Sequence, residues 1–212
     1  MILLMAATKL EIPVFINDEH KKTDVLITGV GAPSAMYHLQ KRLQQIDYDL
    51  VIQAGIAGAF STEAALGETV IVRQDTFGDI GMEEKKSFKT IFQSGFADEN
   101  EFPYQQGWLI NKNKIIDELN LRKVKAVTIN KVTDDTLQKE QLINLFKADI
   151  ETMEGASLHY VCLQENIPFI QLRSISNYVG ERDKTKWKMK DAIINLNREI
   201  LNIIDHYKFS IQ

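Results

Sequence analysis

The sequence predicts an α/β fold, in which one three-layer α/β/α domain spans residues 1–212 around a central mixed, largely parallel sheet. Short apolar runs recur along the chain with helical stretches between them, which is typical of strands that alternate with helices. Several runs, such as Val25–Ile27 and Leu50–Ile52, are apolar at every position, as in strands covered on both faces. A chain of 212 residues with 44% apolar residues has enough material for one large core.

These apolar runs predict six strands. They lie at residues 1–7, Asp24–Thr28, Asp49–Ala54, Glu68–Arg73, Val124–Ile129 and Phe169–Ser174. Helices are expected at Pro33–Leu43, Ile115–Leu121, Met153–Glu165 and Lys186–Tyr207. The last helix is the clearest, because its apolar residues repeat at helical spacing and form one stripe. The polar segment Phe92–Gly107 is expected to be a long irregular loop, of the kind that forms lids or interfaces.

Composition and charge exclude several classes of function. A formal net charge of -4 does not favour a nucleic-acid partner, and the basic cluster Lys184–Lys190 is expected to be a solvated helix start. No apolar run approaches the roughly 18 residues of a membrane span. The single cysteine, Cys162, lies in an apolar run and is expected to be a buried structural thiol in a reducing, cytoplasmic protein. The four histidines have no metal-ligand spacing, so neither a metal nor a cofactor is expected.

Four segments combine turn residues with polar groups at predicted strand ends, where open α/β sheets bind ligands. They are Thr28–Ser34, Ala54–Ala59, Glu151–Ala156 and Arg173–Gly180. The first is no complete dinucleotide-binding fingerprint, because Ser34 replaces its last glycine. The small residues of the second leave room for a flat ring, or serve tight helix–sheet packing. The acids of the third either partner a helix dipole or bind a ribose diol while Met153 packs on the sugar.

In this order and spacing, the four segments resemble the nucleoside phosphorylase/hydrolase superfamily. The stretches Met153–Ala156 and Arg173–Asn177 carry the resemblance, which extends from Ala7 to the final helix. It implies a nucleoside phosphorylase-like fold and a small nucleoside substrate. It also implies a homodimer or higher homo-oligomer, in which a loop such as Phe102–Tyr104 closes the 5′ pocket of the neighbouring subunit.

One departure from the family pattern favours hydrolysis. Phosphorylases of this group carry a phosphate-binding arginine two residues before the glycine that matches Gly55, but Gln53 stands there, with no basic replacement nearby. Water is therefore the expected nucleophile. The phosphorylase-like turn Gly29–Ser34 keeps a purine nucleoside phosphorylase as an alternative.

A second departure concerns the purine. Adenine-specific nucleosidases, such as methylthioadenosine/S-adenosylhomocysteine nucleosidases, have an aspartate where Asn177 stands, and that acid protonates N7 of the leaving base. Asparagine cannot deliver a proton, but its amide can donate to O6 and accept from N7–H of a 6-oxopurine. The sequence at Asn177, within the stretch Ser176–Asp183 and followed by Trp187, resembles that of the futalosine hydrolases. Members of that family release hypoxanthine in menaquinone biosynthesis.

The resemblance also assigns expected roles to residues. Glu11 would activate water, Glu154 would bind the 2′- and 3′-hydroxyls of ribose beside Met153, and Asn177, steadied by Ser176, would hold the base. The purine would contact the remaining expected site residues, Ala57, Gly58, Val132 and Thr133. Glu151 lies one place off the family's first acid and receives no role. Arg182 or Lys184 could meet the benzoate of futalosine.

Two further alternatives stay open at this point. Asn177 disfavours a methylthioadenosine-type nucleosidase but does not eliminate it. A nucleoside-binding sensor without catalysis is the alternative outside the enzymes. The presence of Glu11 and Glu154 argues against a sensor, because a pure binder has no use for a carboxylate that activates water.

Overall fold

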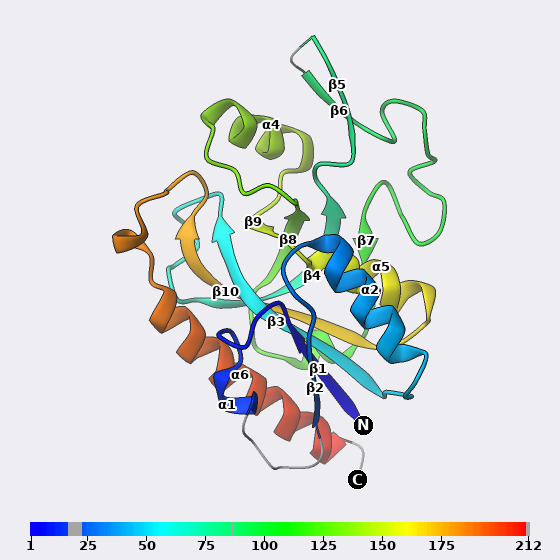
Figure 1. The fold of residues 1–212 in the computed structure, drawn as a ribbon, viewed down its shortest axis with the longest axis vertical. Coiled ribbons are helices and arrows are strands. Elements are labelled where there is room, and N and C mark those ends of the chain that lie inside the picture. The colour runs from blue at the N-terminus through cyan, green and yellow to red at the C-terminus, as the bar shows by residue number, and fades with distance from the viewer. Residues whose placement is uncertain (17–22, 86, 211–212) are drawn as a thin grey trace.

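The computed structural model describes residues 1–16, 23–85 and 87–210, so His20 lies outside the described residues. Its strands are β1 (Ile2–Ala6), β2 (Thr23–Ile27), β3 (Leu50–Ala59), β4 (Thr69–Phe77), β5 (Gly81–Glu84), β6 (Ser87–Thr90), β7 (Leu109–Ile110), β8 (Lys123–Thr128), β9 (Ile150–Thr152) and β10 (Phe169–Tyr178). Its α-helices are α1 (Pro13–Ile16), α2 (Ala32–Leu43), α3 (Ile115–Glu118), α4 (Thr136–Phe146), α5 (Gly155–Gln164) and α6 (Met189–Ser210) (Figure 1).

The main sheet is mixed and closes on itself. Within the described residues, β3 pairs with β10, β10 with β4, β4 with β8, β8 with β9, and β9 again with β3. Strands β1 and β2 extend this ring from β3 as parallel neighbours. Five of the pairings of this sheet are parallel, and β10–β4, β3–β9 and β4–β7 are antiparallel. The expected mixed, largely parallel sheet is confirmed, but the sequence did not predict its closure.

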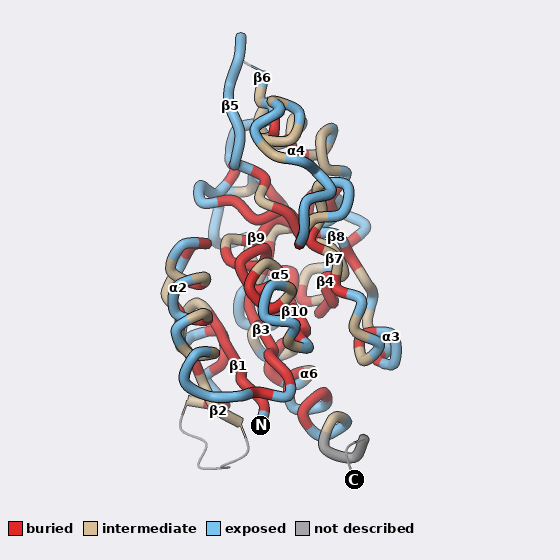
Figure 2. The backbone as a smooth tube through the Cα atoms, turned by 90° about the vertical axis from the view of Figure 1, so that its right-hand side faces the viewer, coloured by how far each residue is buried: buried red, intermediate tan, exposed pale blue. Residues whose placement is uncertain are grey.

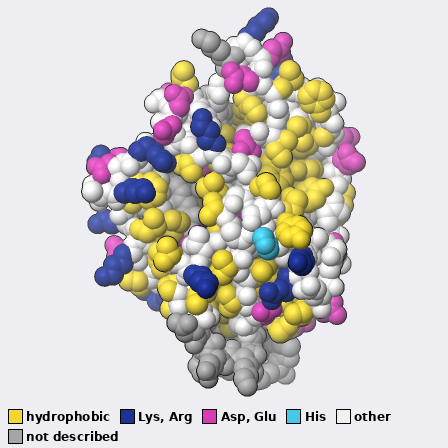
Figure 3. All heavy atoms as spheres, in the orientation of Figure 1, with side chains coloured by type: hydrophobic (Ala, Val, Ile, Leu, Met, Phe, Trp, Pro, Cys, Tyr) yellow, Lys and Arg dark blue, Asp and Glu magenta, His cyan; other side chains and the backbone are white. Residues whose placement is uncertain are grey.

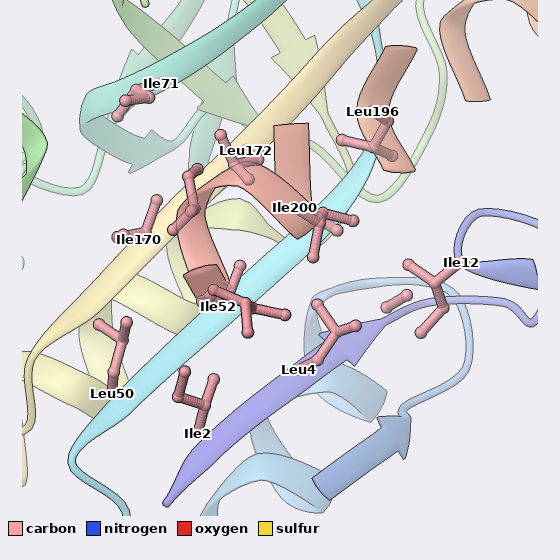
Figure 4. Packing of buried hydrophobic residues seen from close by; sticks show 14 of the residues in the cluster. Ile2, Leu4, Ile12, Leu50, Ile52, Ile71, Ile170, Leu172, Leu196 and Ile200 are labelled. Carbon is pink, nitrogen blue, oxygen red and sulfur yellow. The ribbon is translucent and has the colours of Figure 1, made fainter. Parts of the chain in front are cut away.

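The two faces of β1 pack against different helices. Ile2 and Leu4 belong to the same core cluster as Leu196 and Ile200 of the apolar stripe of α6 (Figure 4). Leu3 and Met5, on the other face of β1, belong to a second cluster with residues of α2 and α5. Strand residues alternate between faces, so this partition is the direct result of an apolar run buried on both sides. Buried strands occupy the middle of the molecule, and the exposed β5–β6 hairpin projects from one end (Figure 2).

Most element predictions are confirmed, with shifted ends. All six predicted strands form, but β3 and β10 continue to Ala59 and Tyr178 because they pair with each other along their full length. The helix expected from Met153 begins at Gly155, and the one expected to reach Leu121 ends at Glu118. The residues 92–107 are irregular, as predicted. The prediction missed the shortest elements (α1, β5, β6, β7 and β9) and the helix α4.

Several composition-based expectations can be compared with the structure. Cys162 is buried, and burial raises the pKa of its thiol, as expected for a structural residue. The lysines of the 184–190 cluster are exposed. Among the described residues, no helix has the length and apolar character needed to cross a bilayer. No set of three or more potential ligand side chains in the described part of the chain could hold a metal ion.

Candidate active site

A cavity of about 330 Å³ opens where the loop after β1, the C-terminal halves of β3 and β10, strand β9 and the start of α6 meet. Eight of the nine expected site residues line it: Glu11, Ala57, Gly58, Val132, Met153, Glu154, Ser176 and Asn177. The ninth, Thr133, is buried behind the wall, where its N–H donates to Oε1 of Glu151 over 3.3 Å. Segments that lie far apart in the sequence therefore form one concave site, as expected for strand ends of an α/β sheet.

Glu11 is held by the backbone on both sides of the cavity. Its Oε2 accepts hydrogen bonds from the N–H of Thr8 at 2.9 Å and from the Thr8 hydroxyl at 3.2 Å. Its Oε1 accepts from the N–H of Ile56 at 3.3 Å. Asn197 of α6 donates to the Glu11 carbonyl at 2.8 Å and so fixes the loop. Burial raises the pKa of Glu11 above its usual value, and the charge of Arg173 opposes that rise.

Glu154 is anchored by a buried network beneath the cavity. Its Oε1 accepts from the N–H of Gly31 at 3.0 Å, and its Oε2 lies 3.6 Å from Nη1 of Arg173. Gln53 completes the network, because its side chain accepts from Arg173 at 3.0 Å and donates to the Glu154 carbonyl. A Cβ at position 55 would collide with the Arg173 guanidinium, so Gly55 provides the space for it.

This network corrects one expectation. The sequence indicated no basic group near Gln53, but Arg173 lies directly beside it in space. The statement was wrong because residues distant in sequence, on β3 and β10, are neighbours in the parallel pairing. Arg173 is only 2% exposed, and its guanidinium is bonded to Gln53 and paired with Glu154. Among the described residues that line the cavity there is neither lysine nor arginine.

A β-bulge places two successive residues of β10 in the cavity. The register with β3 shifts between Ile175 and Asn177, so Ser176 and Asn177 both line the cavity instead of pointing to opposite faces. The Ser176 hydroxyl donates to Oδ1 of Asn177 at 2.7 Å, and Nδ2 of Asn177 donates to the Tyr178 carbonyl at 3.1 Å. A carbonyl can only accept, so these bonds fix which way the amide faces. Among the described residues, one N–H and one oxygen lone pair of the Asn177 amide have no further partner and can bind a ligand.

The opening of the cavity is apolar. Leu10, Val30 and Val132 are exposed at its edge. Trp187, just before α6, and Met189, the first residue of α6, also line it. The N–H of Lys188 donates to the Ser176 carbonyl at 2.8 Å, which ties this segment to β10. Arg182 and Lys184, expected as contacts for a 5′ carboxylate, are exposed and do not line the cavity.

A profile of the phosphorylase superfamily matches residues 14–207, which is nearly the whole chain. The chain belongs to the phosphorylase superfamily. This member is 28% identical over 218 aligned residues to a futalosine hydrolase of Thermus thermophilus, covering 96% of this chain and 95% of the relative. It is 25% identical to a 5′-methylthioadenosine/S-adenosylhomocysteine nucleosidase of Colwellia psychrerythraea, covering 88% and 81% of the two chains.

The solved structures give the same fold for this superfamily member. The crystal structure of futalosine hydrolase from Helicobacter pylori superposes with a TM-score of 0.78 over 97% of both chains, at 18% sequence identity. At that identity the similarity supports the nucleoside phosphorylase-like fold alone. The α/β class and the mixed sheet predicted from the sequence are thereby confirmed.

Sequence reasoning missed the positions of two buried charged residues of this phosphorylase-superfamily site. The sequence places Arg173 in a motif but indicates no role for it, although its guanidinium lies between Gln53 and Glu154. Glu151 is one place off the family pattern and so has no predicted role, although it lines the cavity. An arginine inside an apolar strand was the one available sequence signal, because an isolated buried charge needs a partner.

Proposed function

We propose that this protein is an N-glycosyl hydrolase that cleaves futalosine into hypoxanthine and dehypoxanthinylfutalosine, in menaquinone biosynthesis. The proposal rests on Asn177, which lines the cavity and whose amide orientation is fixed by hydrogen bonds with the Ser176 hydroxyl and the Tyr178 carbonyl. Its free N–H can donate to O6 of a 6-oxopurine, and its free lone pair can accept from N7–H. The second bond exists only after N7 has gained a proton, so it strengthens towards the transition state.

The carboxylates support a hydrolytic mechanism. Glu154 binds the ribose diol beside Met153, and Glu11 orients a water molecule and accepts its proton. The water oxygen bonds to C1′ while the bond from C1′ to N9 breaks through an oxocarbenium-like state. Hypoxanthine gains a proton from solvent water, and Glu11 returns its own proton to solvent. A general base of this kind contributes roughly 10²- to 10⁴-fold to the rate.

The glycine turn after β2 offers little support to the phosphorylase alternative. Three of its N–H groups already have partners within the chain. Gly29 donates to the Ala7 carbonyl at 3.1 Å, Gly31 to Glu154 at 3.0 Å and Ala32 to the Asn130 side chain at 3.2 Å. A phosphate would need these donors or a cation. Arg173, the nearest cation of the network, is already paired with Glu154.

We also infer a homodimer as the working form. Hydrophobic side chains gather on one face of the molecule, over α2 and the loop before β7 (Figure 3). Large aromatic side chains there are strongly exposed: Tyr37 at 61%, Phe96 at 72% and Phe102 at 64%. Exposed apolar patches of this kind are typical of protein–protein interfaces. A second copy would cover this face and bring the Phe102–Tyr104 segment to the apolar opening of the neighbouring cavity.

A substrate panel tests the proposed base and nucleophile together. The purified protein is incubated with futalosine, inosine and methylthioadenosine, each with and without phosphate, and the free base is followed by chromatography. We expect hypoxanthine from futalosine whether or not phosphate is present. Release that requires phosphate would make the protein a phosphorylase. Preferred release of adenine would contradict the role of Asn177.

A further inference from the structure

Glu151 is a buried carboxylate in the cavity wall that the mechanism above does not use. It lies on β9, is 7% exposed and lines the cavity. Its Oε1 accepts from the N–H of Thr133 at 3.3 Å. Its Oε2 has no hydrogen-bond partner of normal geometry among the described residues. Burial raises the pKa of Glu151, and the neighbouring Thr133 side chain and the charge of Arg182 oppose that rise. A buried carboxylate without full hydrogen bonding is costly, so such a group in a cavity points to a ligand donor.

The sheet register fixes where this carboxylate lies relative to Asn177. Gly58 of β3 pairs with Asn177 of β10 on one side and with Glu151 of β9 on the other. Residues in register on adjacent strands share a face of the sheet, and all three line the same cavity. Because neighbouring strands lie about 4.8 Å apart, the two outer backbones are about 10 Å apart. Gly58, which has no side chain, forms the floor between them.

This arrangement is a slot for a flat bicyclic base. A Cβ at Gly58 would approach Nδ2 of Asn177 to 3.3 Å and a methyl of Val179 to 3.1 Å, so glycine keeps the floor open. A purine whose O6/N7 edge meets Asn177 turns its N1 edge towards the opposite wall, where Glu151 lies. The expected contact of the purine with the Thr133 backbone is not possible through the Thr133 N–H, because Glu151 accepts it.

We infer that Glu151 is the residue that selects a 6-oxopurine, by accepting a hydrogen bond from its N1–H. This inference rests on the proposed function and names the chemistry of the base at the same site. In hypoxanthine or guanine N1 carries a hydrogen and can donate to a carboxylate. In adenine N1 is an acceptor, so its lone pair would face the ionised carboxylate and no hydrogen bond could form between them. Asn177 and Glu151 thus form hydrogen bonds with two adjacent edges of one base, and Thr133 positions the carboxylate.

The test measures binding of free bases, which does not require hydrolysis. Calorimetry gives the Kd of hypoxanthine and of adenine for the unaltered protein, for Glu151→Gln, and for Asp75→Asn as control. Asp75 is a buried carboxylate that does not line the cavity. We expect the unaltered protein and the control to prefer hypoxanthine. Glu151→Gln should reduce that preference by about 10- to 100-fold, the value of a hydrogen bond to a charged acceptor.

Two outcomes would overturn the inference. One is an unchanged hypoxanthine-to-adenine ratio in Glu151→Gln, and the other is an equal loss of both bases, which would indicate a purely structural role. Glu151→Asp keeps the charge but shortens the side chain by one methylene group, so it should give an intermediate hypoxanthine-to-adenine preference. This second variant tests the inference if Glu151→Gln does not fold. If the unaltered protein prefers hypoxanthine but does not cleave futalosine, the proposed function fails while the assignment of Glu151 stands.

Discussion

At the scale of single residues, the proposed chemistry depends on Glu11. Replacing it with glutamine keeps the size of the side chain but removes the base, so kcat should fall by about 10²- to 10⁴-fold. Single-turnover assays and hypoxanthine binding check this prediction, and binding should change little. Loss of binding together with retained turnover would contradict the assignment of Glu11 as the group that activates water.

The pH dependence of the reaction follows from the same carboxylate. Glu11 must be ionised to accept a proton, and burial raises its pKa above the usual 4.5. Activity should therefore be lost as pH falls through the raised pKa, so the acid limb of kcat/KM should have its midpoint above 4.5. A midpoint at or below 4.5 in a profile corrected for acid unfolding would mean that another group controls this limb.

The sequence could predict these residues to different degrees. Glu11, Glu154 and Asn177 were found because each falls at a position of a family pattern, and the structure brings all three to one cavity. Arg173 and Glu151 were not assigned, because their environment depends on strand pairing. The three-residue strand β9, which carries Glu151, is too short to show a periodic pattern.

At the scale of elements, two glycines test how the strands and helices shape the slot. An alanine at Gly58 would need only small shifts of Val179 and Asn177 but would occupy the floor beneath the purine. An alanine at Gly155, the first residue of α5, would collide with the buried Gln171 and Asp75 side chains. We expect Gly58→Ala to lower kcat/KM with a change in unfolding free energy of less than about 1 kcal/mol, and Gly155→Ala to cost about 1–3 kcal/mol.

Urea unfolding and steady-state kinetics on both variants check the two expectations. Each glycine variant serves as the control for the other, since both add one methyl group near the site. An unchanged kcat/KM in Gly58→Ala would contradict the slot, because a base bound above Gly58 would clash with the added methyl group.

A buried polar cluster links β4, β8 and β10 behind α5. Asp75 of β4 is fully buried and accepts a hydrogen bond from the Thr128 hydroxyl at 3.0 Å. Burial raises the pKa of Asp75 to about 7. Since the unfolded chain loses this proton near pH 4, the folded state becomes less stable, relative to the unfolded one, as pH rises from about 4 to 7.

Asp75→Asn removes this dependence. The unfolding free energy of the unaltered protein minus that of the variant should therefore fall between pH 4 and 7, by an amount of the order of a few kcal/mol. Above pH 7 the difference should be constant. Urea titrations at several pH values measure it, and the subtraction cancels the opposite effect of His159, whose pKa burial lowers to about 4. A difference that is flat from pH 4 to 7 would show that Asp75 is ionised in the folded protein throughout.

At the scale of the whole molecule, the sequence predicted the α/β class and the order of the main elements. Apolar runs and helical apolar stripes indicate which residues are buried. The continuous apolar run of β1 indicates that side chains on both of its faces are buried. The closure of β3, β10, β4, β8 and β9 into a ring was not predictable. It depends on which strands pair across long separations, and three of the pairings in the sheet are antiparallel.

The inferred homodimer makes a prediction at this scale. Phe102→Asp places a charge on the exposed aromatic face and should shift sedimentation equilibrium from dimer to monomer. The KM for futalosine should rise in parallel, since the 5′ end of the cavity would lose the neighbouring segment. Arg198→Asp is the control, because Arg198 is an exposed residue of α6, which packs on the other face of β1 from α2. A monomeric unaltered protein with full activity would contradict the dimer.

The central claim is that water attacks C1′ of futalosine in this cavity. The most direct measurement is turnover of futalosine in phosphate-free buffer made with ¹⁸O-labelled water, followed by mass spectrometry of both products. The account predicts free hypoxanthine without label and one ¹⁸O atom in the sugar product. No cleavage until phosphate is added, with a sugar phosphate as product, would contradict the account and make the protein a phosphorylase.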